Sequence, residues 1–284
     1  DLLVTDDNGC QNNFTNYNVQ VSNLPNPNII FTSSISGLEA CEGDIVLISD
    51  NSTYTDFPPN TVSWNINPSA SITSPLIAST TVDLTTPGTY TLYLDITDAN
   101  NCPATTSVVI DVLDNPTAVI DPIATKCEDL INLISPTNLT HSSIPGGGLI
   151  AQYEWSFGYP VPNQIINVPD NGNTIHFYSC NSYNVNLTIT DDNGCTHTSL
   201  PVSATINCNP TANFSATDVC FGTPTYFDAA TTPNNSIPVT GSNIINHTWS
   251  SAQIPGTGTS TSALPDFQWP FSAGTHNVTL LIQD

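Results

Sequence analysis

Apolar and polar residues alternate along short segments of this chain, and turn residues separate the segments. In residues 183–189, every second side chain is apolar, which is the pattern of a β-strand with one buried face. The Asp-Asn-Gly sequence at 192–194 favours a tight hairpin turn, because these residues tolerate a positive φ. Ala204 and Ile206 then mark the returning strand. Amphipathic helical patterns of useful length are lacking, so the sequence predicts an all-β fold.

Four sets of residues recur along the chain with a common period of about ninety residues. One set is the cysteine that ends a Thr-Asp-x-Asn-x-Cys motif, with spacings of 92 and 93 residues. A second cysteine set, a tryptophan set and a tyrosine set have spacings between 86 and 94 residues. The four sets are Cys10, Cys102 and Cys195; Cys41, Cys127 and Cys220; Trp64, Trp155 and Trp249; and Tyr90, Tyr183 and His276. A period shared by four independent markers indicates tandem copies of one structural unit.

A unit of this length, with regular turns and one tryptophan before its final hairpin, fits an immunoglobulin-like β-sandwich. Asn-Pro pairs end the units, since proline lacks a ladder donor and stiffens a linker. The predicted units are residues 1–26, the closing hairpin of a preceding repeat, then 27–116, 117–210, and 211–284, which is truncated before its closing hairpin. Asp284 falls within a strand of the repeat, so we expect this sequence to be a window on a longer array. The aromatic residues expected in the sandwich cores are Trp64, Trp155, Trp249, Tyr90 and Tyr183.

Several segments of the repeat share the motifs of a known domain. Residues 212–214 are Ala-Asn-Phe, residues 219–222 are Val-Cys-Phe-Gly and residues 226–228 are Tyr-Phe-Asp. Residues 153–158 contain Trp-x-Phe-Gly, and residues 88–98 follow a Gly-x-Tyr strand pattern that ends in Asp. Together these motifs resemble the PKD domain in the cysteine-bearing form found in Bacteroidetes surface proteins. Long acidic arrays of such units are similar to the giant gliding-motility adhesins exported by the type IX secretion system.

The composition excludes several classes of function. The chain has 24 Asp and Glu but a single Lys or Arg, Lys126, and its formal net charge is −23. Nucleic acids and anionic membrane surfaces are bound through Lys and Arg, so we expect neither as a partner. No apolar run is long enough to span a bilayer, so we expect no membrane insertion. Eight cysteines in a chain this polar suggest an oxidising, extracellular setting at the cell surface.

The two recurrent cysteines of a unit fall at opposite ends of the expected sandwich. Eight residue steps of a strand span roughly 26 Å, whereas a disulfide needs Cα atoms within about 7 Å. Pairing within a unit, such as Cys41–Cys102, is therefore awkward, and it stays an alternative if the strand assignment differs. Cys41 faces the final turn of the next unit, which predicts the interdomain pair Cys41–Cys195, with the other members of the two sets paired outside this stretch. Cys180 and Cys208 occur in one unit only and lie opposite each other on expected partner strands, which predicts a cross-strand disulfide.

Acidic and amide side chains gather in the turns and linkers. Asp114, Asn115, Asp191 and Asp192 offer the oxygen ligands that Ca²⁺ requires, so one interpretation is a calcium site where linker and turn converge. The other is that Asp and Asn satisfy the turn backbone and face water. Calcium is the single cofactor that the sequence suggests.

Motifs that carry catalysis are missing. The sequence has no Gly-x-Ser-x-Gly, and Gly146-Gly147-Gly148 lacks the lysine that follows in a phosphate-binding loop. His276 takes the tyrosine position of the repeat, which favours a structural role over that of a base. We therefore expect no enzymatic activity.

The leading functional hypothesis is a segment of a long extracellular adhesin or filament stalk with a mechanical role. Its expected partners are further repeats of the same chain, the outer-membrane secretion and motility machinery, and a surface polysaccharide or substratum contacted by regions outside this sequence. The alternatives are a PKD spacer or binding module of a secreted protease or glycosidase, and an S-layer-like surface protein.

Overall fold

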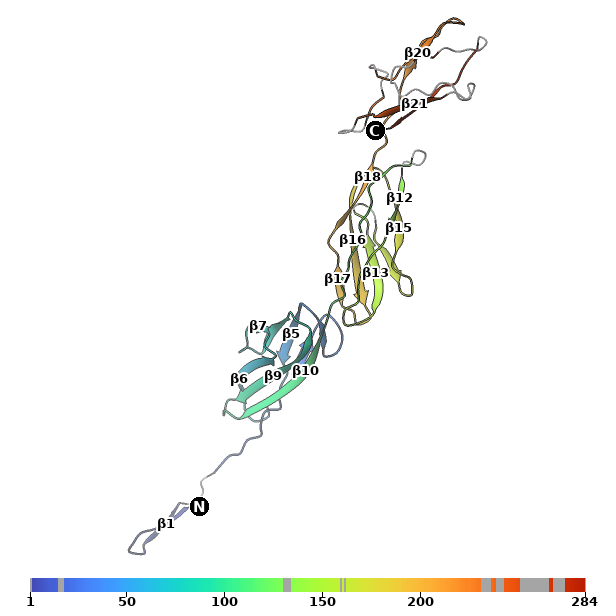
Figure 1. The fold of residues 1–284 in the computed structure, drawn as a ribbon. Coiled ribbons are helices and arrows are strands. Elements are labelled where there is room, and N and C mark those ends of the chain that lie inside the picture. Colours follow the sequence, from blue (N-terminus) through green and yellow to red (C-terminus); the bar gives the residue numbers. More distant parts are fainter. Residues whose placement is uncertain are drawn as a thin grey trace.

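A computed structural model describes residues 2–14, 18–129, 134–158, 160, 162–230, 236–238, 243–250, 266–267 and 274–283. These residues form strands joined by turns and loops, which confirms the all-β prediction. In this part of the chain, no helix has the length and apolar character needed to cross a membrane. Figure 1 shows three β-sandwiches following one another along the chain, with a separate hairpin at the N-terminal end. Asp284, which the sequence places within a strand of the repeat, lies outside the described residues.

The unit at 27–116 consists of two four-stranded sheets, as an immunoglobulin-like sandwich requires. One sheet has the order β3-β5-β8-β7 and the other β4-β10-β9-β6, in which β4 runs parallel to β10. The strands of the first sheet are β3 (Ile29–Thr32), β5 (Asp44–Asp50), β7 (Ser71–Ile72) and β8 (Ser79–Leu84). Those of the second are β4 (Glu39–Cys41), β6 (Pro59–Asn67), β9 (Gly88–Asp98) and β10 (Pro103–Leu113).

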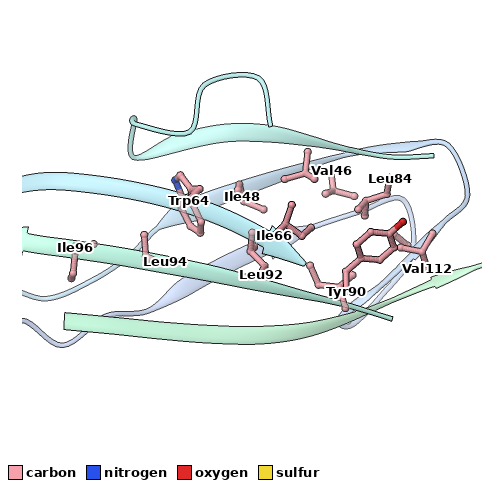
Figure 2. Packing of buried hydrophobic residues seen from close by; sticks show 13 residues of the cluster. Val46, Ile48, Trp64, Ile66, Leu84, Tyr90, Leu92, Leu94, Ile96 and Val112 are labelled. Carbon is pink, nitrogen blue, oxygen red and sulfur yellow. The ribbon is translucent and has the colours of Figure 1, made fainter. Parts of the chain in front are cut away.

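The core of this unit lies between its two sheets, where the buried side of each strand presents every second residue (Figure 2). Trp64 is buried there, and its Nε1 donates a hydrogen bond to the Ile77 carbonyl at 2.9 Å. Tyr90 is buried as well, and its hydroxyl donates to the Thr86 carbonyl at 2.9 Å. A tyrosine bonded back to the chain just before its own strand is the corner found in many sandwich domains. Both aromatics therefore occupy the core positions that the repeat predicts.

The unit at 117–210 also consists of two sheets, but its strands are divided unequally between them. Its larger sheet has the order β11-β18-β16-β13-β14, with β17 also paired to β16, and its smaller sheet pairs β12 with β15. Trp155 is fully buried and donates from Nε1 to the Gly172 carbonyl at 2.7 Å. Tyr183 is half-buried, and its hydroxyl bonds to that of Ser179 at 2.9 Å. The strands are β11 (Lys126–Cys127), β12 (Ser135–Leu139), β13 (Ile150–Ser156), β14 (Gln164–Asn167), β15 (Thr174–Tyr178), β16 (Asn181–Asp191), β17 (Thr196–Thr198) and β18 (Val202–Asn207).

Fewer strands are described in the two flanking parts of the chain. At the N-terminal end, β1 (Leu2–Thr5) and β2 (Gln11–Phe14) form an antiparallel hairpin. In the unit at 211–284, Trp249 is fully buried against Phe214 and Phe227. Its strands are β19 (Ser215–Ala216), β20 (Thr225–Asp228), β21 (Asn246–Ser250), β22 (Asp266–Phe267) and β23 (Thr279–Gln283). Each described strand of the chain lies within one predicted unit.

Strand β5 offers a matched test of which face of the sheet forms the core. Ile48 is fully buried, whereas Ile45 on the same strand is 71% exposed. We expect Ile48→Ala to lower the free energy of unfolding of this unit by about 2–5 kcal/mol, because it leaves a cavity. Ile45→Ala should change it by less than about 0.5 kcal/mol. The free energy of unfolding of each variant is measured by denaturant titration, with hydrogen exchange of the β5 and β9 amides as the readout for this unit. Equal losses of stability in the two variants would contradict the assigned core.

Candidate functional site

The turn that follows β16 is held by its own first side chain. The Asp191 Oδ1 accepts the backbone N–H groups of Asn193, at 3.1 Å, and Cys195, at 2.7 Å. The Asp191 N–H in turn donates to the Cys195 carbonyl at 2.9 Å. An aspartate that replaces backbone acceptors in this way fixes a turn locally. We call residues 191–195 the closing turn. These hydrogen bonds fix the backbone of Cys195 at its end.

The same turn occurs in the other copies of the motif. Asp98 accepts from the N–H groups of Asn100 and Cys102, both at 2.9 Å. Asp6 accepts from the N–H of Cys10 at 2.8 Å. We call the cysteine that ends this turn (Cys10, Cys102 or Cys195) the late cysteine of its unit. The local sequence alone therefore positions each late cysteine, since even the isolated hairpin β1–β2 has this geometry.

The other recurrent cysteine of a unit (Cys41, Cys127 or Cys220), which we call the early cysteine, lies at the opposite end of the sandwich. In the unit at 27–116 it is positioned by the parallel pairing of β4 with β10. Cys41 ends β4, where it lies opposite Leu113, the last residue of β10. The Glu42 N–H donates to the Leu113 carbonyl at 2.8 Å, and the Cys41 N–H donates to Asp44 Oδ2 at 3.0 Å. Cys41 thus sits beside the point where the chain leaves this unit for the next.

Both predicted disulfides are present in the structure. Cys41 and Cys195 are bonded across the junction of the two units, with Cα atoms 5.6 Å apart and a sequence separation of 154 residues. Cys180 and Cys208 are bonded within one unit, with Cα atoms 4.7 Å apart. The alternative pair Cys41–Cys102 does not form, and Cys102 is a free thiol. We call the Cys41–Cys195 disulfide the staple.

A loop of three glycines fills the space between the linker and the closing turn. The Gly147 N–H donates to the Asp114 carbonyl of the linker at 2.8 Å. A Cβ on Gly146 would lie 2.3 Å from that same carbonyl oxygen, and a Cβ on Gly148 would lie 2.4 Å from Asp192 Oδ1. The glycine loop, residues 146–148, can approach both neighbours this closely because it has no side chains.

Further hydrogen bonds hold the linker on each side of the junction. Asn115 Nδ2 donates to the Glu42 carbonyl at 2.8 Å, which ties the linker to the unit before it. The Ala118 N–H, just after the linker, donates to Nδ1 of His197 at 2.9 Å, which ties the first residues of the unit at 117–210 to its own β17. Sequence reasoning missed the roles of the glycine loop and His197, because neither belongs to the repeated markers.

The residues expected to bind calcium surround the glycine loop but carry other contacts. Asp192 Oδ1 accepts from the Leu149 N–H at 2.7 Å, and Asp191 Oδ1 holds the closing turn. Asp191 Oδ2 and Asn115 Oδ1 are buried and have no hydrogen-bond partner, a situation that a bound cation would relieve. The carboxylates of Asp114, Asp191 and Asp192 do not form a set of three oxygens within 4.8 Å of one another. The calcium site therefore stays a prediction.

One other group of potential metal ligands occurs among the described residues. It consists of Glu128, Cys180 and Cys208 at the far end of the same unit. Its two cysteines are bonded to each other, which removes both thiolates as ligands. The Glu128 carboxylate instead accepts the Cys180 N–H at 2.8 Å. This group supports the end of β18 rather than a metal ion.

A pocket in the unit at 211–284 has a simple structural explanation. It lies between residues 216–223 and residues 274–278. By the spacing of the repeat, these segments correspond to β4 and to the start of β9, which in the first sandwich flank β10. The pocket therefore lies where the unit at 27–116 has a β-strand.

Comparison with known proteins finds similar folds but no family. No family model and no curated protein matches the chain. The fibronectin(III)-like modules of Clostridium thermocellum CbhA are 12% identical over 63% of this chain and 94% of theirs, with a TM-score of 0.35. An I-band fragment of titin is 12% identical over 92% of this chain and 88% of its own, with a TM-score of 0.35. The Bacteroides ovatus protein SGBP-B, solved with a mixed-linkage heptasaccharide, is 13% identical over 91% of this chain and 65% of its own, with a TM-score of 0.24.

The glycine loop allows a test of how closely the two units must approach. We expect Gly146→Ala to loosen the junction, because the new Cβ would meet linker backbone atoms at 2.3–2.4 Å. Gly147→Ala is the matched control, since its Cβ would have no neighbour nearer than 3.2 Å. The measurement is the rate at which a thiol reductant opens the staple, followed by peptide mapping. Gly146→Ala should raise that rate about tenfold over the control, which corresponds to about 1.4 kcal/mol; equal rates would show that the loop does not shape the junction.

The calcium prediction is tested by melting the chain with and without a chelator. Calcium bound at Asp191 would stabilise the unit at 117–210, so chelation should lower its melting temperature by several degrees. Asp191→Asn keeps the Oδ1 acceptor of the closing turn but removes the charge, and should abolish the difference. Asp98→Asn is the control, because it alters the equivalent turn of the other sandwich, which has no glycine loop. A melting temperature unchanged by chelation would leave these residues as turn and linker groups only.

Proposed function

We propose that this chain is a segment of an extracellular adhesin stalk, with a mechanical role. The observation that carries the proposal is the staple, which joins two successive sandwich units by a covalent bond in addition to the main chain. Tandem immunoglobulin-like domains are typical of extracellular stalks and binding modules. A staple across a junction limits how far one unit can bend or pull away from the next, which is useful in a stalk.

The chemistry of the chain supports an extracellular location at the cell surface. Disulfides persist in oxidising surroundings and are rare where glutathione keeps thiols reduced. The staple is well protected, since Cys41 is 6% exposed and Cys195 1% exposed. A net charge of −23 adds mutual repulsion between neighbouring chains. These features suit a filament that stays separate from its neighbours outside the cell.

The finer proposal is a gliding-motility adhesin. It is supported by the likeness of residues 153–158, 219–222 and 88–98 to PKD motifs of Bacteroidetes surface proteins. In this role the stalk would transmit force from outer-membrane machinery to a tip that grips polysaccharide or another substratum, after export by the type IX system. The repeats themselves would perform no catalysis.

Antibody labelling of living source cells tests this function. An antibody raised against residues 117–210 should label filaments that travel along the cell surface. Pre-absorption of the antibody with the purified chain is the control, and it should remove the signal. Static filaments would retain the stalk but overturn the motility role. Signal mainly in the medium, co-purifying with a protease or glycosidase, would overturn the stalk in favour of an accessory module.

A further inference from the structure

We propose that the staple carries tension directly from the first strands of one unit to the last strands of the next, so that the main chain of residues 42–194 lies off the covalent load path. This inference deepens the proposed function, because it concerns a stalk that is pulled along its length. It depends on where the two cysteines lie in the order of strands, and on no contact beyond the disulfide itself.

The covalent route through the two units is short. A pull on the N-terminal side enters at β3 and reaches Cys41 at the end of β4. It crosses the disulfide to Cys195 and leaves through β17 and β18. All strands from β5 to β16 lie inside the closed loop, and with them most of both cores, including Trp64 and Trp155. Tension therefore passes beside the two cores rather than through them.

Strand pairings at the two ends of the route hold the loaded chain to the rest of each sandwich. On the first side, β3 is paired with β5 through Ile29–Thr32, and this four-residue pairing resists peeling. On the second side, β18 is paired with β16, and the Cys180–Cys208 disulfide links the two chain segments at one end of that pairing, next to Asn181 and Ile206. Glu128 accepts from the N–H groups of Cys180 and Asn209 at the same place. The exit strand is thus secured at the end where the chain leaves the unit.

The staple also limits how far the chain can lengthen if the units unfold. Cys41 and Cys195 are 154 residues apart, which is roughly 510–550 Å of extended chain at about 3.3–3.6 Å per residue. The disulfide replaces that length with a single bond. An array held this way would keep nearly its folded length under loads that unfold ordinary tandem domains.

The remaining cysteines occupy the same two kinds of position. Cys127 ends β11, which is parallel to β18, and the Glu128 N–H donates to the Asn207 carbonyl at 3.0 Å, as Glu42 does to Leu113. Cys220, the next early cysteine after Cys195, lies 25 residues further along. If every junction had a staple, the covalent route would follow the main chain only from one late cysteine to the next early one, such as from Cys195 to Cys220. That stretch of 25 residues would serve two units and could extend to roughly 80–90 Å. Two strands of the length of β9, eleven residues, span roughly 70 Å, so such an array could hardly stretch.

Single-molecule stretching of the whole chain, held at its two ends, tests the inference on the purified protein. The oxidised chain should reach a final extended length roughly 510–550 Å shorter than the same chain after reduction. The C180S/C208S variant is the matched control, because it loses the other disulfide, and it should remain just as short when oxidised. The C41S/C195S variant should fall short of the reduced length only by the 28 residues that Cys180–Cys208 encloses, roughly 90–100 Å.

An oxidised wild-type chain that extends as far as C41S/C195S would overturn the inference. Comparing one molecule before and after reduction requires no variant, so a variant that folds poorly does not affect this result. The outcome is also independent of the cell labelling. If the oxidised chain stays short but cells show no labelled filaments, the load path through the staple stands and the adhesin role is overturned. If cells show moving filaments but the oxidised chain extends fully, the adhesin role stands and the load path is overturned.

Discussion

The staple between Cys41 and Cys195 is the bond on which the arrangement of the two central units depends. It forms because each cysteine is already held by its own backbone: Cys41 by the parallel pairing of β4 with β10, and Cys195 by the carboxylate of Asp191. In a chain-entropy description, closing a loop of this length removes about 5 kcal/mol of freedom from the unfolded chain. The staple therefore stabilises two units at once, and it fixes which end of one faces which end of the other.

The rest of the junction is closely fitted and mainly polar, with the Ile35 side chain lying against Gly194 of the closing turn. The buried apolar residues form separate clusters, one inside each sandwich, and no described cluster spans the junction. Contact is made by backbone hydrogen bonds, by Asn115 against the Glu42 carbonyl, and by the glycine loop between linker and turn. Such an interface orients the two units but buries little apolar surface. The disulfide therefore provides the stability of association that a buried apolar interface provides between other domains.

The charge of the chain also favours a covalent link between successive units over ion pairs. With one basic side chain among 24 acidic ones, salt bridges between units have almost no cationic partner to use. The single base, Lys126, donates to the Pro136 carbonyl within its own unit at 2.6 Å. Successive acidic units repel one another, and salt screens that repulsion only in part. A disulfide is insensitive to charge and ionic strength, which makes it a suitable link for a chain of this composition.

Much of this architecture could be read from the sequence because its causes are local and repeated. Alternation of apolar residues placed the strands, the period of about ninety residues placed the units, and Trp64, Trp155 and Tyr90 lie in the cores as expected. The Asp-x-Asn-x-Cys turn is determined within five residues, so even the isolated turn at Asp6 keeps its hydrogen bonds. The strand order of a sandwich then separates the two cysteines of a unit, which excludes their pairing.

Only the tertiary structure decided what surrounds the staple. The glycine loop has no repeated counterpart, and its use appears only when residues 113–115 and 191–193 are brought to its two sides. The same holds for His197, whose ring nitrogen accepts the backbone N–H of Ala118, 79 residues earlier in the chain, at the start of the same unit. Local patterns determine turns and strands, because their hydrogen bonds join near neighbours. The fit of one unit against the next depends on atoms far apart in sequence, and no local pattern encodes their distance.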